Sequence, residues 1–325
     1  MTRSEQISGL IFGATAGDCL GTPYVFMKSK DLFQQASQIC WHISDSGGCA
    51  QMMFTAIHSI SKHGTDLEKL ARSYQNWVHK GQSETDYVTA LCFDHKKYLS
   101  RAELIQNAQN ADYGALCSGQ LLIRQLPLVL ACATQPLCIL NRLIEADTRL
   151  SHADEDTLAY AKLYAQCLHG ILNGRSRVEI WDQLFKQVEC PRVYKTLLCS
   201  YYDKPVCDSR DYSHAQITLG ISLYHFWHNT PFVSALRSTI LSGGATDINA
   251  AAVGALLGAS QGLNAIPAPW RACLLETDNC ERLRHSIIKA ERLVSPRTHD
   301  LERPSRRALP PRSLTLTSSA DKQNK

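Results

Sequence analysis

Asp247 is the residue whose neighbours in the sequence point most directly to a chemical role. It follows Gly243 and Gly244, a pair that favours a tight turn, and precedes a run of small residues that favours a closely packed helix. Thr246 and Asn249 add a hydroxyl and an amide beside it. Oxygen atoms of these kinds accept hydrogen bonds from a ligand, and a carboxylate also binds hard cations. We therefore expect a ligand-binding turn here, with Asp247 as its single candidate metal ligand.

A second carboxylate, Asp18, lies near the end of an N-terminal run that carries glycine at every fourth position, at residues 9, 13, 17 and 21. Residues four apart share one face of a helix, so these glycines leave a smooth face on which another helix can pack closely. Asp18 can accept structural hydrogen bonds at the end of this helix or contact a ligand, and the sequence leaves both roles open.

The third group begins with Asp45 and Ser46 and continues into the start of an expected helix over residues 51–61. Between Ser46 and this helix lie four residues that supply no side-chain oxygen, namely Gly47, Gly48, Cys49 and Ala50. A cysteine at a helix N-terminus can have a lowered thiol pKa, so Cys49 is either a reactive thiol or an inert small residue. In the middle of the chain, Ser118, Gly119 and His152 are further candidate ligand contacts, although a histidine at a helix start also serves in packing or capping.

Taken together, these segments resemble the ADP-ribosylglycohydrolase family over about residues 7–293. The family's C-terminal motif is matched in order by Gly243, Gly244, Thr246, Asp247, Gly254, Gly258, Gly262, Leu263, Ile266, Pro267 and Trp270. Its opening helix and Gly-Asp-x-x-Gly turn resemble residues 9–27. Residues 74–77, 117–127 and 151–152 resemble its middle motifs more weakly.

The resemblance implies an all-α domain in which two magnesium or manganese ions assist the hydrolysis of ADP-ribosyl groups. This chain departs from the implied metal and catalytic motifs at Val25, Gly47, Gly48, Cys49, Ala50, Ala245 and Ile248. We therefore expect no metal cofactor and a catalytically degenerate protein that retains ADP-ribose binding or acts as an interaction scaffold. The alternatives are an active hydrolase with a rearranged site built from Asp45, Asp247 and Asn249, and a different reaction that uses Cys49.

Helical periodicity accounts for most of the chain, and strand patterns are sparse, so the sequence predicts an all-α fold. We expect one compact multi-helix domain over residues 5–295 and a disordered basic tail over residues 296–325, rich in Pro, Arg and Ser. The expected helices cover residues 7–20, 51–61, 67–79, 120–132, 157–172, 178–187, 214–228 and 233–241.

Composition narrows the class of protein further. The formal charge of +4 resides in the tail, which has seven Lys or Arg and three Asp or Glu, so the domain itself gives no specific nucleic-acid signal. The 13 cysteines are scattered without a C-x-x-C pair, which favours free thiols. No membrane span or signal peptide is expected, and the cytoplasm is the expected location. The expected partners are ADP-ribose or an ADP-ribosylated protein, and a protein that contacts the tail.

Overall fold

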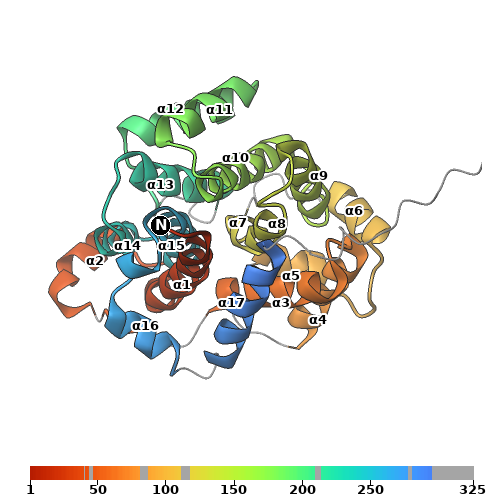
Figure 1. Ribbon diagram of the computed structural model, residues 1–325, viewed down its shortest axis with the longest axis horizontal. Helices are drawn as coiled ribbons and strands as arrows, with labels where there is room; N and C mark the ends of the chain where they lie inside the picture. Colours follow the sequence, from red (N-terminus) through yellow and green to blue (C-terminus); the bar gives the residue numbers. More distant parts are fainter. Residues whose placement is uncertain are drawn as a thin grey trace, which may run out of the picture. The chain divides into compact units, whose positions relative to one another are not determined.

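The computed structural model describes residues 1–39, 41–43, 47–80, 87–110, 118–208, 214–276 and 280–294, and Figure 1 shows them as a packed set of helices. Within these ranges there is no strand, and the one extended pairing is an isolated antiparallel bridge between Ser118 and His214. This confirms the all-α prediction. Met1–Ser295 forms one compact unit. The tail over residues 296–325 lies outside the described residues, so its disorder and its partner stay predictions.

Helices make up most of the described chain. In chain order they are α1 (Arg3–Gly21), η1 (Thr22–Tyr24), α2 (Ser29–Gln34), η2 (Ala36–Gln38), α3 (Gly48–His63), α4 (Leu67–His79), α5 (Tyr87–Phe93), α6 (Arg101–Asn110), α7 (Gln120–Arg124), α8 (Leu126–Ala131), α9 (Leu137–Thr148), α10 (Glu155–Leu172), α11 (Arg177–Gln187), α12 (Pro191–Tyr202), α13 (Ala215–Trp227), α14 (Phe232–Leu241), α15 (Thr246–Gln261), η3 (Leu263–Ala265), α16 (Ala268–Leu274) and α17 (Cys280–Val294).

Local sequence explains where several helices begin and end. The hydroxyl of Thr2 and the carboxylate of Glu5 form a capping box at the start of α1, and Asp154 caps α10 by accepting from the N–H of Thr157. The single helix predicted over residues 120–132 is instead two helices that meet at Gln125. Pro127 explains the break, because it lacks the N–H that would continue the helix.

Helices α1 and α15 form the most extensive helix–helix contact among the described residues and lie together in the left half of Figure 1. They run antiparallel, because Gly9 of α1 meets Gly258 of α15 and Gly21 meets Thr246. A Cβ atom built on Gly13 would lie 2.1 Å from the carbonyl oxygen of Gly254, and one on Gly254 would lie 2.1 Å from that of Gly13. Gly9 faces Gly258 in the same way. The prediction of a smooth glycine face is confirmed, and the two backbones approach to a distance that no larger residue allows.

The remaining helices enclose this pair. Helices α13 and α14 pack on α15, α3 and α17 pack on α1, and α10 is tied to α15 by the hydroxyl of Tyr164, which donates to the carbonyl of Ala252 at 2.8 Å. Among the described residues no helix is both long and apolar enough to span a membrane. None of the cysteines whose side chains are described forms a disulfide, as expected from the sequence.

Candidate functional site

Three helix ends meet at one point of the domain. The antiparallel packing brings Asp18, near the end of α1, beside Asp247, in the first turn of α15, and Cys49 joins them from the first turn of α3. One possible ligand atom from each of these three residues lies within 4.8 Å of the others. Asp18 and Cys49 are buried and Asp247 is half-buried. The structure thus assembles three sequence-predicted residues into one cluster.

Asp18 has a clear structural role. Its Oδ2 accepts a hydrogen bond from the backbone N–H of Ala50 at 2.9 Å, although the two residues are 32 positions apart. The first N–H groups of a helix have no partner within the helix, and Gly47, which precedes α3, has no side chain to cap them. The negative charge also favours the positive end of the α3 dipole. Asp18 therefore docks α3 on α1 and faces the cluster at the same time.

The Gly-Gly turn holds the loop that follows α1. Gly243 and Gly244 have positive φ angles of 73° and 76°. The N–H of Gly244 donates to the carbonyl of Met27 at 3.0 Å, and its own carbonyl accepts from the N–H of Phe26 at 2.9 Å. Val25, where the family resemblance implies a glutamate, lies half-buried in this loop. Two backbone hydrogen bonds thus join the loop to the turn.

The next residues of α15 are engaged in packing. The hydroxyl of Thr246 donates to the carbonyl of Gly21 at 2.7 Å, and Ala245, before the helix, is buried. Asn249 is fully buried, and its Oδ1 accepts from the hydroxyl of Thr218 at 2.8 Å. The amide oxygen expected to help a metal site is therefore already occupied by a protein donor.

Gly119 fits tightly against the same part of α15. A Cβ atom at this position would lie 2.1 Å from Thr218 Oγ1 and 2.9 Å from Ile248 Cγ2. The next residue, Gln120, is buried and directs its Nε2 toward Cys49 Sγ at 3.9 Å. The segment that leads into α7 thus reaches the cluster through Gln120, whereas Gly119 serves close packing.

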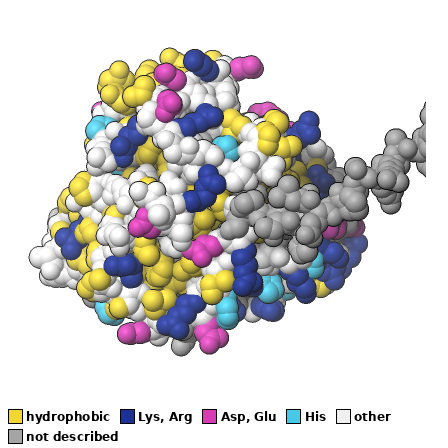
Figure 2. All heavy atoms as spheres, in the orientation of Figure 1, with side chains coloured by type: hydrophobic (Ala, Val, Ile, Leu, Met, Phe, Trp, Pro, Cys, Tyr) yellow, Lys and Arg dark blue, Asp and Glu magenta, His cyan; other side chains and the backbone are white. Residues whose placement is uncertain are grey.

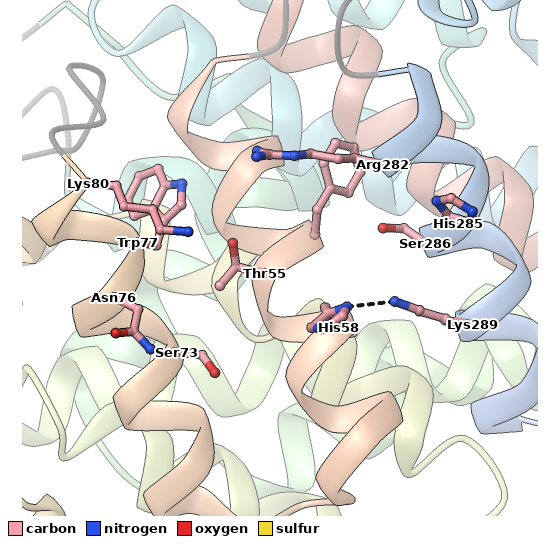
Figure 3. A pocket seen from close by; sticks show the side chains of 11 residues that line it. Thr55, His58, Ser73, Asn76, Trp77, Lys80, Arg282, His285, Ser286 and Lys289 are labelled. Carbon is pink, nitrogen blue, oxygen red and sulfur yellow. Dashed lines mark hydrogen bonds between the residues drawn. The ribbon is translucent and has the colours of Figure 1, made fainter.

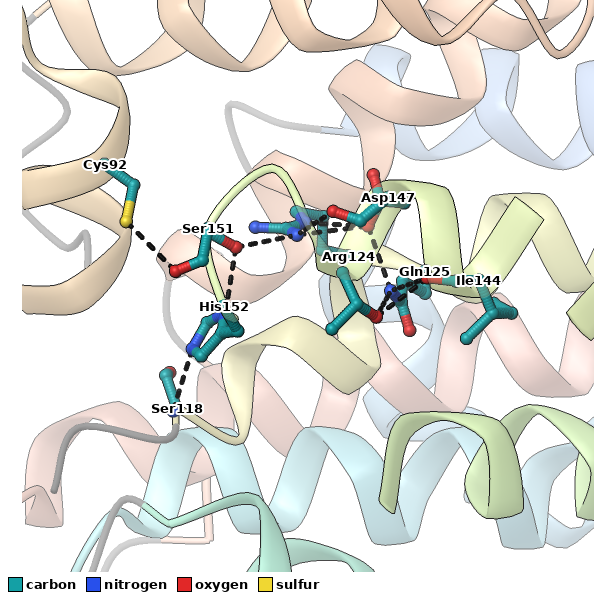
Figure 4. Close-up of polar contacts among 9 residues, drawn as sticks. Cys92, Ser118, Arg124, Gln125, Ile144, Asp147, Ser151 and His152 are labelled. Carbon is teal, nitrogen blue, oxygen red and sulfur yellow. Dashed lines mark hydrogen bonds and ion pairs between the residues drawn. The ribbon is translucent and has the colours of Figure 1, made fainter. Parts of the chain in front are cut away.

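His152 belongs to a buried polar network beside the cluster (Figure 4). Its Nδ1 lies 2.8 Å from Ser151 Oγ, and its Nε2 accepts from the backbone N–H of Ser118 at 3.4 Å. Burial, and then the charge of Arg124, lowers the pKa of His152 to about 3. The imidazole is therefore neutral near pH 7, and because Nε2 accepts a hydrogen bond, the proton resides on Nδ1.

An ion pair anchors this network. Arg124 and Asp147 are both almost completely buried, and Arg124 Nε donates to Asp147 Oδ2 at 3.1 Å (Figure 4). Burial is the largest influence and acts to lower the pKa of Arg124, but the charge and hydrogen bond of Asp147, together with Tyr74, outweigh it and the net pKa is raised. Arg124 Nη2 also donates to Ser151 Oγ at 3.0 Å, which links the ion pair to His152. His152 therefore supports the segment over residues 118–120 through the hydrogen bond that it accepts from the backbone of Ser118.

The described residues of the cluster do not by themselves supply the ligands for a pair of magnesium ions. Magnesium prefers octahedral oxygen coordination, and a two-metal site needs several oxygen ligands spaced to bridge both ions. The cluster offers two carboxylates and one thiol, and Asp18 Oδ2 already accepts from Ala50. Asp45 and Ser46, the other candidate oxygen donors, lie outside the described residues. A thiol with two carboxylates is instead a donor set suited to a single zinc-like ion.

Several functional contacts were not predicted from the sequence. No sequence pattern singled out Asp147 or Thr218, because the hydrogen-bond partner that gives each its role lies more than 20 residues away in the chain. Arg124 did carry one, since an arginine within the apolar run over residues 121–133 needs a buried partner. The convergence of Asp18 and Cys49 on Asp247 depends on how three helices pack.

Comparisons with known proteins agree with this architecture. The sequence model of the family described as ADP-ribosylglycohydrolase matches residues 1–297. A protein of Acanthamoeba polyphaga mimivirus named "Putative ADP-ribosyl glycohydrolase" is 21% identical over 323 residues, covering 88% of this chain and 95% of its own. A solved structure of an ADP-ribosylglycohydrolase-related protein complex superposes with a TM-score of 0.70 at 20% identity, covering 90% of this chain and 99% of its own. The chain therefore belongs to the ADP-ribosylglycohydrolase family.

Proposed function

We propose that this protein recognises ADP-ribose, free or attached to a protein, without the dimagnesium hydrolysis that the family resemblance implies. The observation that carries the proposal is the donor set at the three helix ends, which consists of Asp18, Cys49 and Asp247. Gly48, Cys49 and Ala50 add no side-chain oxygen in the first turn of α3. Two hard cations therefore lack the ligands that would hold them and activate a water.

The frame around the cluster supports retained binding. The first turns of α3 and α15 meet at the cluster, where the half-buried carboxylate of Asp247 can accept hydrogen bonds from hydroxyl groups such as those of a ribose. The Gly243–Gly244 turn and the close packing at Gly119 are backbone features that do not depend on a metal. Loss of the metal ligands removes the hydrolytic step and leaves this frame in place.

Calorimetry with free ADP-ribose and the full chain tests the binding claim. We expect binding that Asp247→Ala weakens, because this carboxylate is the least buried member of the cluster. Lys97→Gln, which removes an exposed charge in the loop before α6, is the matched control and should leave the affinity unchanged. Absence of binding to the natural chain would contradict the proposal and favour a scaffold.

Magnesium titration of thermal unfolding tests the loss of the metal site. A ligand that binds only the folded state raises the midpoint of thermal unfolding. Because we propose that the natural chain has no magnesium site, millimolar magnesium should leave its midpoint unchanged. The positive control is a variant that carries, at these three loops, the oxygen-bearing residues that the family resemblance implies. Its substitutions are Val25→Glu, Gly47→Thr, Gly48→Asp, Cys49→Asp, Ala50→Thr, Ala245→Asp and Ile248→Thr. A magnesium-dependent rise in the natural chain would contradict the proposal.

A second candidate function is hydrolysis at a single-metal site, and the proximity of Asp18, Cys49 and Asp247 is the observation that favours it. Three protein ligands leave a fourth position of a zinc ion for water, which the metal would activate. The expected signature is release of ADP-ribose from ADP-ribosyl-serine or ADP-ribosyl-arginine that requires zinc and is lost in Cys49→Ala. Release that survives removal of zinc by a chelator would exclude this candidate.

A further inference from the structure

A second polar pocket lies between α3, α4 and α17 and shares no residue with the cluster described above (Figure 3). Its volume is about 340 Å³. Five of the 11 lining residues are basic, and none is acidic. The basic residues are His58, Lys80, Arg282, His285 and Lys289. Figure 2 shows Lys, Arg and His side chains gathered over this part of the face.

The wall of the pocket presents a buried donor. Trp77 is 4% exposed and lines the pocket from α4, and among the described residues its Nε1 has no hydrogen-bond partner. An indole N–H can only donate, so this group needs an acceptor that the described protein does not supply. A buried donor left without a partner carries an energetic penalty.

Lys289 and His58 face each other across the pocket (Figure 3). Lys289 Nζ lies 2.6 Å from His58 Nδ1. Burial, and then the charge of Lys289, lowers the pKa of His58, so the imidazole is a neutral acceptor at pH 7. An ammonium group has three N–H donors, and this contact uses one of them. Lys289 therefore has further N–H donors for a ligand.

We propose that this pocket binds a small phosphate-bearing ligand. Lys80, Arg282 and Lys289 supply positive charge, and none of the described lining residues is a carboxylate that would oppose a bound anion. Ammonium and guanidinium groups form strong charge-assisted hydrogen bonds to phosphate oxygens. The volume lies at the lower end of small-molecule sites, which run from about 300 to 1,000 Å³. Phe54 and Trp77 are each 4% exposed, so phosphate charge rather than ring stacking carries the recognition.

Calorimetry with pyrophosphate and the full chain, at low ionic strength, tests this proposal. We expect binding that Arg282→Gln and Lys289→Gln each weaken at least about tenfold, the effect of losing one charge-assisted hydrogen bond. Arg292→Gln is the matched control, because Arg292 is on the same helix but does not line the pocket. Unfolding midpoints of all variants establish that they remain folded.

Two further arms locate the site and identify the ligand. Asp247→Ala, in the separate cluster, should leave pyrophosphate binding unchanged, which distinguishes this pocket from the proposed ADP-ribose site. ADP should bind at the pocket and adenosine should not, because adenosine lacks phosphate. Absence of pyrophosphate binding, or equal weakening by Arg292→Gln and Arg282→Gln, would overturn the proposal.

Discussion

Replacement of Gly13 by alanine probes the contact on which the whole site depends. In an isolated helix this change is stabilising by roughly 1 kcal/mol, because alanine is the better helix former. Here the new Cβ atom would lie 2.1 Å from the carbonyl oxygen of Gly254, whereas real Cβ contacts are essentially never under 3.0 Å. The two atoms must therefore separate by at least 0.9 Å, the difference between these distances.

The rigidity of both partners sets the magnitude of the effect. The obstructing atom is backbone in the middle of α15, so no side-chain rotation can relieve the overlap. Overpacking of a core typically costs about 1–3 kcal/mol, and separation of α1 from α15 also weakens dispersion contacts along the most extensive interface of the fold. We expect Gly13→Ala to lower the free energy of unfolding by about 3 kcal/mol or more, the upper end of that range.

Thermal and denaturant unfolding measure this loss. At about 2.1 cal/mol/K of unfolding entropy per residue, each kcal/mol shifts the midpoint of the Met1–Ser295 unit by about 1.6 °C, so the expected fall is about 5 °C or more. Gly220→Ala in α13 is the matched control, because its new Cβ atom would meet only Pro205 side-chain atoms, the nearest at 3.5 Å. That variant should be as stable as the natural chain or more stable. Equal stability of the two variants would refute the close-packing argument.

Two predictions concern buried charge and protonation. Asp147→Ala leaves Arg124 buried without its counter-charge and should lower the free energy of unfolding by about 3–5 kcal/mol, whereas Asp156→Ala at the more exposed pair with Arg192 should change it by no more than about 1 kcal/mol. Similar losses in the two variants would contradict the buried-pair account. Burial lowers the pKa of His225 to about 4. Between pH 6.5 and 4 the unfolded chain therefore binds more protons than the folded chain, and the free energy of unfolding decreases as the pH decreases. His225→Gln should reduce this slope by about 1 kcal/mol per pH unit between pH 6 and 4.5, as measured by urea unfolding; an unchanged slope would show that His225 is not buried in its neutral form.

Local patterns predicted much of the fold. The four-residue glycine spacing in α1 indicated a closely packed partner helix, and Gly13 does meet Gly254. Short or polar helices such as α2 and α6 were missed, because six to ten residues carry too weak a periodic signal. Helix α17 was also missed, although Leu283, Ser286, Ala290 and Val294 are buried at helical spacing.

The candidate site was predicted in its parts but not in its assembly. Asp18, Cys49 and Asp247 were each singled out, and the sequence left open whether Asp18 is structural or contacts a ligand. The antiparallel crossing of α1 and α15 joins Asp18 and Asp247, since it sets the end of one helix beside the start of the other. The hydrogen bond between Ala50 and Asp18 then brings Cys49 of α3 to this point. Arg124 and Asp147 lie 23 residues apart, on helices whose docking a local pattern does not specify.

Release of ADP-ribose from ADP-ribosyl-arginine and ADP-ribosyl-serine by the full chain in millimolar magnesium tests the central claim most directly. We expect no release above the rate without protein, because Asp18, Cys49 and Asp247 do not supply the oxygen ligands that two magnesium ions need. Magnesium-dependent release that Asp247→Ala abolishes would contradict the account.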